Sequence, residues 1–332
     1  MSALACEAII ICRNGGPEVL ERIESSVPAP GPGEVRIVQH AIGLNFADIY
    51  QRRGAAGPHH TSHFPTILGS QGSGVIEALG AGVSGFQLGQ EVTYVHPGAY
   101  ASARLVPAER LVAIPDGLTM ETAAATLLRG MTAEYLLHRL YSVKPGDCVL
   151  IHAAAGGMGL ILSAWARALG AKVIGTVGSP TKKSLALEHG CHYAIDYRNE
   201  NMVAQVAEIT KGEGVHVVYD AVGRDLFLPS LDCLRTRGMA INYGTASGDV
   251  EGFELQRLHA KSLIVCRPTL RTFIASRAEL LMSAQTFAAA VKRGDVRAEV
   301  ARRYALKDIV RAHTELESRQ TTGAPVLLPQ SA

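Results

Sequence analysis

Residues 149–159 limit the possible folds more than any other part of the chain. The apolar run Val149-Leu150-Ile151 predicts a buried strand, and it leads into a turn of small residues with the pattern Ala153-x-x-Gly156-x-x-Gly159. An apolar helical pattern follows from Leu160. Small residues in such a turn let the backbone approach a phosphate closely, and the start of the helix presents free N–H groups to an anion. Gly159 would also let the helix pack tightly on the strand.

The motif has two interpretations. A turn rich in Gly and Ala can be purely structural and bind nothing. Here the turn follows a strand, opens a helix and precedes a second strand at Lys172–Val177, which is the context in which such a turn binds a dinucleotide. We therefore interpret the segment as a variant of the dinucleotide fingerprint, with Gly156 and Gly159 in the phosphate-binding turn.

Short buried strands alternate with helices on both sides of this motif, which predicts parallel strands joined by crossover helices. The first third of the chain instead has short alternating apolar stretches separated by Gly and Pro, the pattern of a β-rich domain with tight turns. The predicted strands are 148–152, 172–177, 193–196, 215–220, 238–243 and 325–328, and the predicted helices are 120–141 (one or two), 160–169, 181–189, 202–210, 226–234 and 277–293.

Composition bounds the class of protein. A chain of 332 residues favours two domains. It has no apolar run long enough for a membrane span and no signal-peptide pattern after Met1. Its formal net charge of +2 gives no support for nucleic-acid binding. The six cysteines are scattered and without a C-x-x-C pair, so we expect free thiols in a reducing compartment, the cytoplasm.

The end of the second strand indicates which dinucleotide would bind. NAD-binding versions carry an acidic residue there for the ribose hydroxyls, but Val177 is followed by Gly178-Ser179-Pro180-Thr181-Lys182-Lys183, without Asp or Glu. Ser179 and Lys182 would donate to a 2′-phosphate instead. A lysine pair at a helix start is by itself usually just solvated. The missing acid makes NADPH the better interpretation.

The chain resembles the zinc-free quinone oxidoreductases of the medium-chain dehydrogenase/reductase superfamily, the zeta-crystallin-like enzymes, nearly from end to end. The resemblance implies a GroES-like, β-rich catalytic domain at 1–128 and 270–332, and a Rossmann NADPH-binding domain, a doubly wound parallel sheet, at 129–269, with the active site in the cleft. The matching segments are Gly43–Tyr50, His152–Gly159, Val218–Asp225, Arg267–Leu270 and Leu316–Arg319. It also implies a homodimer joined through edge strands of the Rossmann sheets. Residues 238–243 and 262–266 are candidates for strands near that edge, and both fit interior strands equally well.

The resemblance further implies functional residues. Asn45 and Tyr50 would hydrogen-bond the acceptor oxygen or the nicotinamide, and they are the predicted catalytic residues. The implied cofactor contacts are Phe46, Ala47, Asp48 and Ile49 beside the nicotinamide; Tyr135 on the helix entering the Rossmann domain; Gly157 and Met158 at the pyrophosphate; Ser179, Lys182, Tyr197 and Arg319 around the 2′-phosphate; and Tyr243, Gly244, Thr245 and Ala246 facing the nicotinamide. Without the family context, Arg319 would be read as a surface charge.

The sequence departs from related patterns in three places. Ser70 and Gln71 replace the His-Glu pair of zinc alcohol dehydrogenases, and no cysteine lies near residue 45, so we expect no metal. The second active-site tyrosine of bacterial relatives is missing from 51–57, with Ala56 near its place. Ala246 stands where the family has serine. His59, His60 and His63 lie between prolines and are interpreted as an exposed loop.

The implied reaction is direct hydride transfer from NADPH to an electron-poor quinone or conjugated carbonyl, with the cofactor carrying the chemistry and the protein supplying orientation. Two alternatives stay open. One is an NADPH-dependent alkenal or enone reductase on the same fold. The other is a cofactor-binding protein with weak catalysis.

Overall fold

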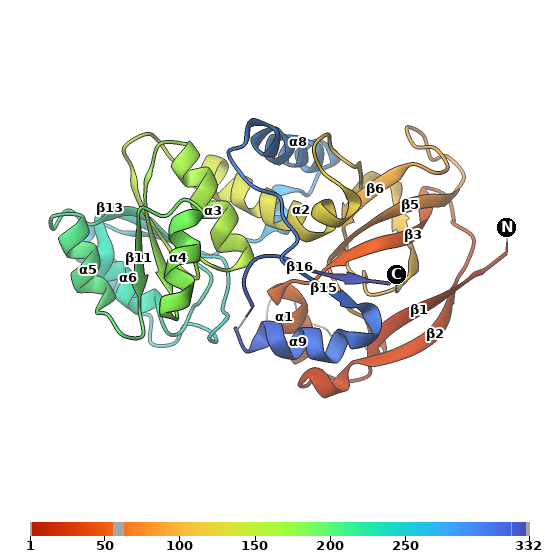
Figure 1. Cartoon of the computed structure of the whole chain (residues 1–332), viewed down its shortest axis with the longest axis horizontal. Helices are drawn as coiled ribbons and strands as arrows, with labels where there is room; N and C mark the ends of the chain where they lie inside the picture. Colours follow the sequence, from red (N-terminus) through yellow and green to blue (C-terminus); the bar gives the residue numbers. More distant parts are fainter. Residues whose placement is uncertain (1, 56–62, 320, 330–332) are drawn as a thin grey trace. The chain divides into compact units, whose positions relative to one another are not determined.

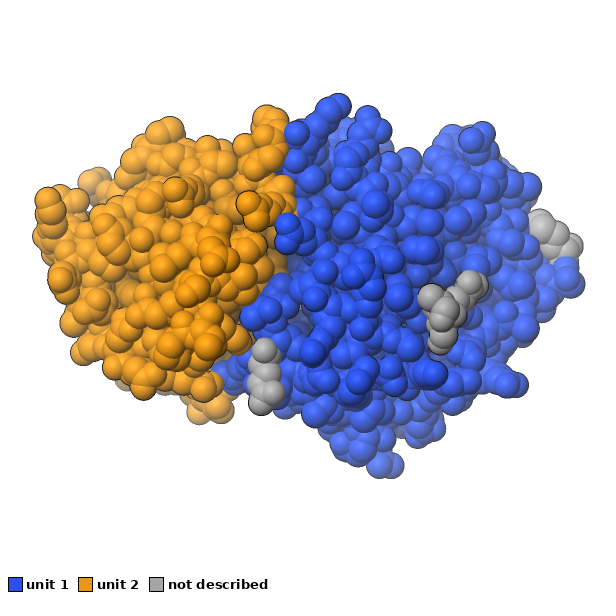
Figure 2. Space-filling model, viewed as in Figure 1, with its two compact units in different colours: residues 1–129, 276–292, 298–332 blue, residues 130–275, 293–297 orange. Residues whose placement is uncertain are grey.

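The computed structural model describes residues 2–55, 63–319 and 321–329. The chain divides into two compact units, coloured separately in Figure 2. Unit 1 contains Met1–Arg129, Ser276–Lys292 and Ala298–Ala332, and unit 2 contains Gly130–Ala275 and Arg293–Arg297. The chain therefore leaves the first unit after Arg129 to build most of the second, returns at Ser276, and passes through the second once more at Arg293–Arg297.

Unit 1 is built on two sheets, as the alternating apolar stretches of its sequence predict. A three-stranded sheet has the order β2-β1-β4, and a seven-stranded sheet has the order β15-β16-β3-β5-β6-β8 with β7 paired to β3. The strands are β1 (Leu4–Ile11), β2 (Glu21–Val27), β3 (Glu34–Gly43), β4 (Thr66–Ile67), β5 (Gln71–Leu79), β6 (Glu91–Val95), β7 (Ala103–Pro107), β8 (Leu111–Ala113), β15 (Arg302–Ala305) and β16 (Pro325–Leu328). The predicted strand at 325–328 is confirmed, and it pairs with β3 at Val326 and Gly43.

The core of unit 1 lies between these strands and its helices. Ile9 and Ile11 of β1, and Val35 and Ile37 of β3, are fully buried at a spacing of two residues, as expected for strands with one covered face. Each such side chain contributes roughly 1.5–3 kcal/mol by leaving water. The helical segments are α1 (Phe46–Arg53), α2 (Met120–Glu134), α8 (Arg277–Arg293) and α9 (Ile309–Glu317), with short 3-10 turns at Pro17–Val19, Ala108–Arg110 and Leu306–Asp308.

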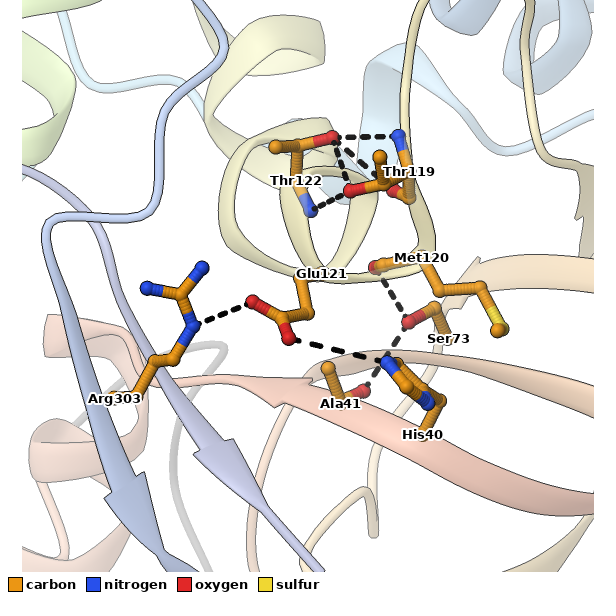
Figure 3. A network of polar contacts seen from close by, with 8 residues as sticks. All are labelled: His40, Ala41, Ser73, Thr119, Met120, Glu121, Thr122 and Arg303. Atoms are coloured by element: carbon orange, nitrogen blue, oxygen red, sulfur yellow. Dashed lines mark hydrogen bonds and ion pairs between the residues drawn. The ribbon is translucent and has the colours of Figure 1, made fainter. Parts of the chain in front are cut away.

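Polar contacts fix the start of α2 to the sheet (Figure 3). The backbone N–H of Thr119 donates to Thr122 Oγ1 at 2.8 Å, and that of Thr122 donates back to Thr119 Oγ1 at 3.2 Å, so two N–H groups of the first turn are satisfied. Ser73 Oγ of β5 donates to the Met120 carbonyl at 2.6 Å, and Arg303 Nε of β15 donates to Glu121 at 2.7 Å. The helix start is therefore held from two strands.

Unit 2 contains a six-stranded parallel sheet with helices between its strands (Figure 1). The strands are β9 (Cys148–Ile151), β10 (Lys172–Val177), β11 (Tyr193–Asp196), β12 (Val215–Asp220), β13 (Leu234–Asn242) and β14 (Ile264–Cys266). The helices are the π-helix η3 (Tyr135–Leu140), α3 (Gly157–Ala168), α4 (Pro180–Glu188), α5 (Met202–Ile209), α6 (Phe227–Cys233), η4 (Leu255–Lys261) and α7 (Leu270–Phe273). The predicted α/β class is confirmed.

The strands lie in the order β11-β10-β9-β12-β13-β14. From β9 the chain adds β10 and β11 towards one edge of the sheet, and it then adds β12, β13 and β14 towards the other edge. Because crossovers between parallel strands are right-handed, α3 and α4 belong to one face and α5 and α6 to the other. The chain thus has a topological switch point between β9 and β12, beyond whose carboxyl ends ligands bind in such sheets. Of the two predicted candidates for an edge strand, β14 is at the edge and β13 is one strand inside it.

Two predicted boundaries need correction. The helix expected from Leu160 begins at Gly157, and the strand expected from Gly238 begins at Leu234. In the first case the glycines read as turn residues already lie in the first helical turn. In the second, the polar run Arg235-Thr236-Arg237 has the composition of a loop although it lies within the strand, and Arg237 adopts a left-handed φ of 61° there.

Candidate active site

The segment at Asn45 folds into the start of a helix for local reasons. Asn45 has an extended backbone, with φ of −125° and ψ of 156°, and its N–H donates to Asp48 Oδ2 at 2.8 Å. This is the backward half of a capping box, in which an acid at the third position satisfies the N-cap amide. Gly54, with φ of 72°, ends α1 in the left-handed conformation that favours glycine.

Helix geometry divides the predicted residues of this segment between two faces. Phe46, Ala47 and Tyr50 are half-buried and share one face of α1, where the rings of Phe46 and Tyr50 have centroids 6.0 Å apart. Asp48 and Ile49 are fully buried and face the core of unit 1. Five consecutive positions of a helix cannot all point at one ligand, so the side chains of Asp48 and Ile49 point away from the face that carries Phe46, Ala47 and Tyr50.

Asp48 is a buried carboxylate surrounded by donors. Besides the Asn45 amide, Ser70 Oγ donates to Oδ1 at 2.6 Å and Tyr100 Oη donates to Oδ2 at 2.9 Å. Burial raises the pKa of Asp48 to about 6, against the opposing effects of these three hydrogen bonds and of Arg129. The carboxylate therefore ionises close to neutral pH.

In unit 2, the predicted phosphate-binding turn forms a tight turn between a strand and a helix, as its sequence predicts. Ala153 has a left-handed φ of 51°, and Gly156 is the N-cap of α3 with φ of −83° and ψ of 168°. A Cβ at Gly159 would lie 2.2 Å from the Ala153 carbonyl oxygen and 2.6 Å from Ala154 Cα, so only glycine fits there. The first-turn amides of Gly157, Met158 and Gly159 begin a twelve-residue helix, where N–H groups point at an anion.

A buried histidine at the start of this turn is hydrogen-bonded to two neighbouring elements of unit 2. His152 Nδ1 lies 2.8 Å from Thr176 Oγ1 of β10, and Nε2 lies 2.7 Å from Ser230 Oγ of α6. Burial lowers the pKa of His152, so the ring is neutral and pairs with both hydroxyls. The predicted motif begins at this residue, and its side chain ties β9 to β10 and α6.

The predicted 2′-phosphate residues of unit 2 gather where β10 and β11 end. The two strands are in register at Val177 and Asp196, so Ser179 and Tyr197 follow at the same edge. A Cβ at Gly178 would lie 3.4 Å from Tyr197 Oη and 3.5 Å from Arg198 Nε, which places both side chains over the turn. Lys183 forms an ion pair with Glu200.

The loop after β13 is tied to the loop after β12. The amides of Tyr243 and Ala246 donate to the carbonyls of Asp220 and Ala221 at 2.8 and 3.1 Å. The fully buried Asp220 accepts from Asn242 Nδ2 at 2.8 Å. In this loop Gly244 and Thr245 are buried, whereas Tyr243 and Ala246 are half-buried. Ala246 stands where the family has serine, and the next residue is Ser247. The Ser247 hydroxyl donates to the Val222 carbonyl at 2.7 Å, within the same pair of loops.

The remaining predicted positions lie in different surroundings. Tyr135 is 1% exposed on the π-helix, stacked on Phe273 with ring centroids 4.2 Å apart. Arg319 belongs to unit 1, where it ends α9 in a left-handed conformation with φ of 57°. His63 is exposed, whereas His59, His60 and Ala56 lie outside the described residues.

Comparisons with known proteins place this geometry in a family. An alcohol dehydrogenase GroES-like domain model matches residues 31–139, and a zinc-binding dehydrogenase model matches 157–293. A quinone oxidoreductase of Pseudomonas aeruginosa is 46% identical, covering 95% of this chain and 97% of its own. The chain belongs to the quinone oxidoreductase family of the zinc-binding dehydrogenase superfamily.

Two further members extend the comparison. The crystal structure of the Escherichia coli quinone oxidoreductase complexed with NADPH has a TM-score of 0.93 at 41% identity, covering 97% of this chain and all of that one. A 2-haloacrylate reductase of Burkholderia is 43% identical, covering 98% of this chain and 99% of its own. The predicted family is thus confirmed, and a 2-haloacrylate reductase is among the proteins similar to this chain.

This member of the superfamily uses Gln71, at the place of the zinc enzymes' glutamate, for structure. Gln71 Nε2 donates to the Ala124 carbonyl, and Oε1 accepts from the Leu128 amide at 2.9 Å. The side-chain amide thus serves the two backbone groups of one turn of α2. In the described part of the chain, no three His, Cys, Asp or Glu side chains are grouped as metal ligands would be.

The sequence analysis missed several residues around the predicted site. Tyr100 contacts Asp48 directly, and His313 contacts Tyr100, but both residues lie far from Asp48 in the sequence. Asp220 is inside a matched segment, and Arg198 directly follows the predicted Tyr197. Only the last two carried a signal, because their neighbours had been assigned.

Proposed function

We propose that this protein reduces quinones with NADPH by direct hydride transfer. The proposal rests above all on the full-length match to quinone oxidoreductases, one of them crystallised with NADPH. The phosphate-binding turn at the switch point of the parallel sheet supports it independently, because this is where dinucleotides bind in such sheets.

The residues present fit NADPH. Gly156, Gly157, Met158 and Gly159 would hold the pyrophosphate, since position 159 has no space for a side chain. Ser179, Lys182 and Tyr197 would hold the 2′-phosphate, because the edge after β10 offers hydroxyls and cations and no carboxylate within 178–183. Arg319 would contribute a further cation. Tyr135 and the 243–246 loop would bound the nicotinamide.

The protein's part in the reaction is orientation. NADPH supplies the hydride, and a quinone is electrophilic enough to accept it without strong acid catalysis. Asn45 and Tyr50 are proposed to hydrogen-bond the acceptor oxygen or the nicotinamide. Tyr50 is suited to this because its ring stands with Phe46 on the half-exposed face of α1. Asn45 is 4% exposed and is fixed at the N-cap.

The two units correspond to the two proposed roles. Unit 2 would be the NADPH-binding domain and unit 1 the GroES-like catalytic domain. The edge strand β14 is proposed to pair with its copy in a homodimer, because Ile264 on it is 50% exposed and Leu255 in the preceding 3-10 helix is 72% exposed. All six cysteines are free thiols, consistent with a proposed cytoplasmic location. No helix in the described residues has the length and apolar character needed to cross a membrane.

The second candidate is reduction of a conjugated carbonyl or acid, because the 2-haloacrylate reductase matches almost as well as the quinone oxidoreductases. One experiment separates the two. The purified protein is mixed with NADPH or NADH and with 1,4-benzoquinone, a larger quinone or a simple enone, and the loss of nicotinamide absorbance is followed. Fast NADPH-specific oxidation by quinones supports the proposal. Preference for the enone assigns the second function, and NADPH binding without turnover leaves a cofactor-binding protein.

A further inference from the structure

A chain of buried hydrogen bonds ends at the backbone of Asn45. Asp48 Oδ2 accepts from Asn45 N–H at 2.8 Å and from Tyr100 Oη at 2.9 Å. Tyr100 Oη lies 3.0 Å from His313 Nε2, and His313 Nδ1 lies 3.1 Å from Arg52 Nη1. The four side chains that form this series of hydrogen bonds are all fully buried.

Chemistry gives every link a single direction. Arg52 has only donors, so His313 Nδ1 must accept from it. Burial and the nearby Arg52 lower the pKa of His313 to about 3, so the ring carries one proton, which must be on Nε2. That N–H donates to Tyr100 Oη, whose own proton is then directed to Asp48. The carboxylate closes the chain as the acceptor of both Tyr100 and the Asn45 amide.

This series of hydrogen bonds joins parts of unit 1 that are distant in sequence. Asp48 and Arg52 are on α1, Tyr100 lies between β6 and β7, and His313 is on α9. Arg52 Nη2 also donates to Glu317 of α9 at 2.7 Å. The first turn of α1 is therefore fixed by α9 and by the segment at Tyr100, as well as by its own helix.

We propose that Tyr100 and His313 are positioning residues for the reaction, acting through Asp48 to hold Asn45 and the half-exposed face of α1 in place. The catalytic part of this proposal rests on the proposed function, in which Asn45 and Tyr50 contact the acceptor or the nicotinamide. Neither Tyr100 nor His313 can touch a substrate itself, because both are fully buried.

A matched control is available in the same core. Tyr94 is also fully buried, and its hydroxyl also donates to a buried acceptor, the Gln39 side chain. Gln39 in turn donates to the carbonyls of Ala99 and Ala101, not to Asp48. Tyr94→Phe thus removes a buried hydroxyl from the same cluster of side chains and leaves the Gln39 donor to the carbonyls that flank Tyr100, and every link from Arg52 to Asn45, in place, so it measures the loss of a buried hydroxyl that is not a link.

The test is the pH dependence of kcat and KM with NADPH and 1,4-benzoquinone for wild type, Tyr100→Phe and Tyr94→Phe. The groups facing Asp48 are the Asn45 amide, Ser70 and Tyr100 from their loops, and Arg129 from α2. Behind Tyr100 lies His313, which is bonded to Arg52 of α1. Loss of the Tyr100 donor disfavours ionised Asp48. We expect kcat to fall about tenfold, KM for NADPH to stay within about twofold, and the acidic limb of kcat to move up by roughly one pH unit.

Rescue at the histidine gives a second measurement. The amide of His313→Gln offers an acceptor and a donor and can keep both links, whereas His313→Leu breaks them. We expect the Gln variant to retain at least about five times the kcat of the Leu variant when both are folded. Equal kcat values and equal pH limbs for Tyr100→Phe and Tyr94→Phe would overturn the proposal.

A readout without activity separates this proposal from the proposed function. Hydrogen exchange of the peptide covering residues 44–50 is compared by mass spectrometry in the same variants. Faster exchange in Tyr100→Phe than in Tyr94→Phe supports the positioning of α1 even if no quinone is reduced. Identical exchange in this peptide contradicts it even if quinone turnover is high.

Discussion

The ammonium group of Lys183 is paired with the carboxylate of Glu200, which reaches it from beyond the end of β11. Lys182 and Lys183 are adjacent in sequence, and this ion pair compensates the charge of Lys183 within unit 2. We propose the turn after β10, with Ser179, Lys182 and Tyr197, for the 2′-phosphate, because the side chains of Tyr197 and Arg198 lie over Gly178.

Replacing Lys182 by alanine should weaken NADPH binding far more than NADH binding. A hydrogen bond to a charged group contributes about 1.5–3 kcal/mol, so we expect roughly a 10- to 100-fold rise in the Kd of NADPH and a change within about twofold for NADH. Kd values are measured by fluorescence titration. Lys183→Ala is the control and should have the smaller effect on NADPH. Equal losses for both cofactors in Lys182→Ala would disprove the phosphate contact.

Much of the fold was predictable because its signals are local. The alternation of short apolar runs with helical segments predicted five strands of the unit 2 sheet, and Gly159 of the Ala-x-x-Gly-x-x-Gly turn predicted the tight packing of the helix on the preceding turn. The start of β13 was missed because Arg235 and Arg237 look like a loop. The order of strands in unit 1, with β16 added to β3, depends on contacts between residues nearly 300 positions apart, which no local pattern records.

The sequence could suggest candidate site residues only where the family motif is continuous in sequence. Asn45 and Tyr50 could be named because they lie in one segment, but their support comes from Tyr100 and His313. Those residues have no motif of their own, and a buried His or Tyr normally indicates packing. Asp48 was predicted as a cofactor contact from its neighbours, and the helical period explains why its side chain instead faces the core.

Tyr50→Phe should lower turnover and leave NADPH affinity unchanged. The change removes one hydroxyl from the half-exposed face of α1 and keeps the ring that stands beside Phe46. Because a quinone needs little acid catalysis, we expect a fall in kcat of about tenfold, below the roughly 100- to 10,000-fold that a positioned proton donor typically contributes. Stopped-flow turnover and NADPH titration on the same sample measure both quantities. Unaltered turnover would remove Tyr50 from the mechanism.

Gln71→Glu should destabilise unit 1. The carboxylate would lose the donor to the Ala124 carbonyl and bring negative charge against that oxygen. A buried acceptor left unsatisfied costs about 1–3 kcal/mol, so we expect the urea midpoint to fall by a corresponding amount. Gln87→Glu, at an exposed position of the same unit, is the control and should change stability by less than about 0.5 kcal/mol. A Gln71→Glu protein as stable as the control would show that the amide does not fix α2.

His313 should make the protein sensitive to acid. Its pKa is lowered to about 3 by burial and by Arg52, against an ordinary value of 6.5, so below pH 6.5 the unfolded chain binds a proton that the folded chain excludes. The stabilising contribution is complete above pH 6.5 and is lost at up to about 1.4 kcal/mol per pH unit as the pH falls towards 3. The raised pKa of Asp48 acts in the opposite direction below pH 6, so the effect must be read as a difference between variants.

Urea unfolding at pH 7.0, 6.0 and 5.0 tests this prediction. The free energy of unfolding should fall less with falling pH in His313→Gln than in wild type or in the half-exposed control His40→Gln. Parallel pH curves for all three would mean that His313 takes up its proton in the folded protein, and the fixed direction of the chain to Asp48 would then be wrong.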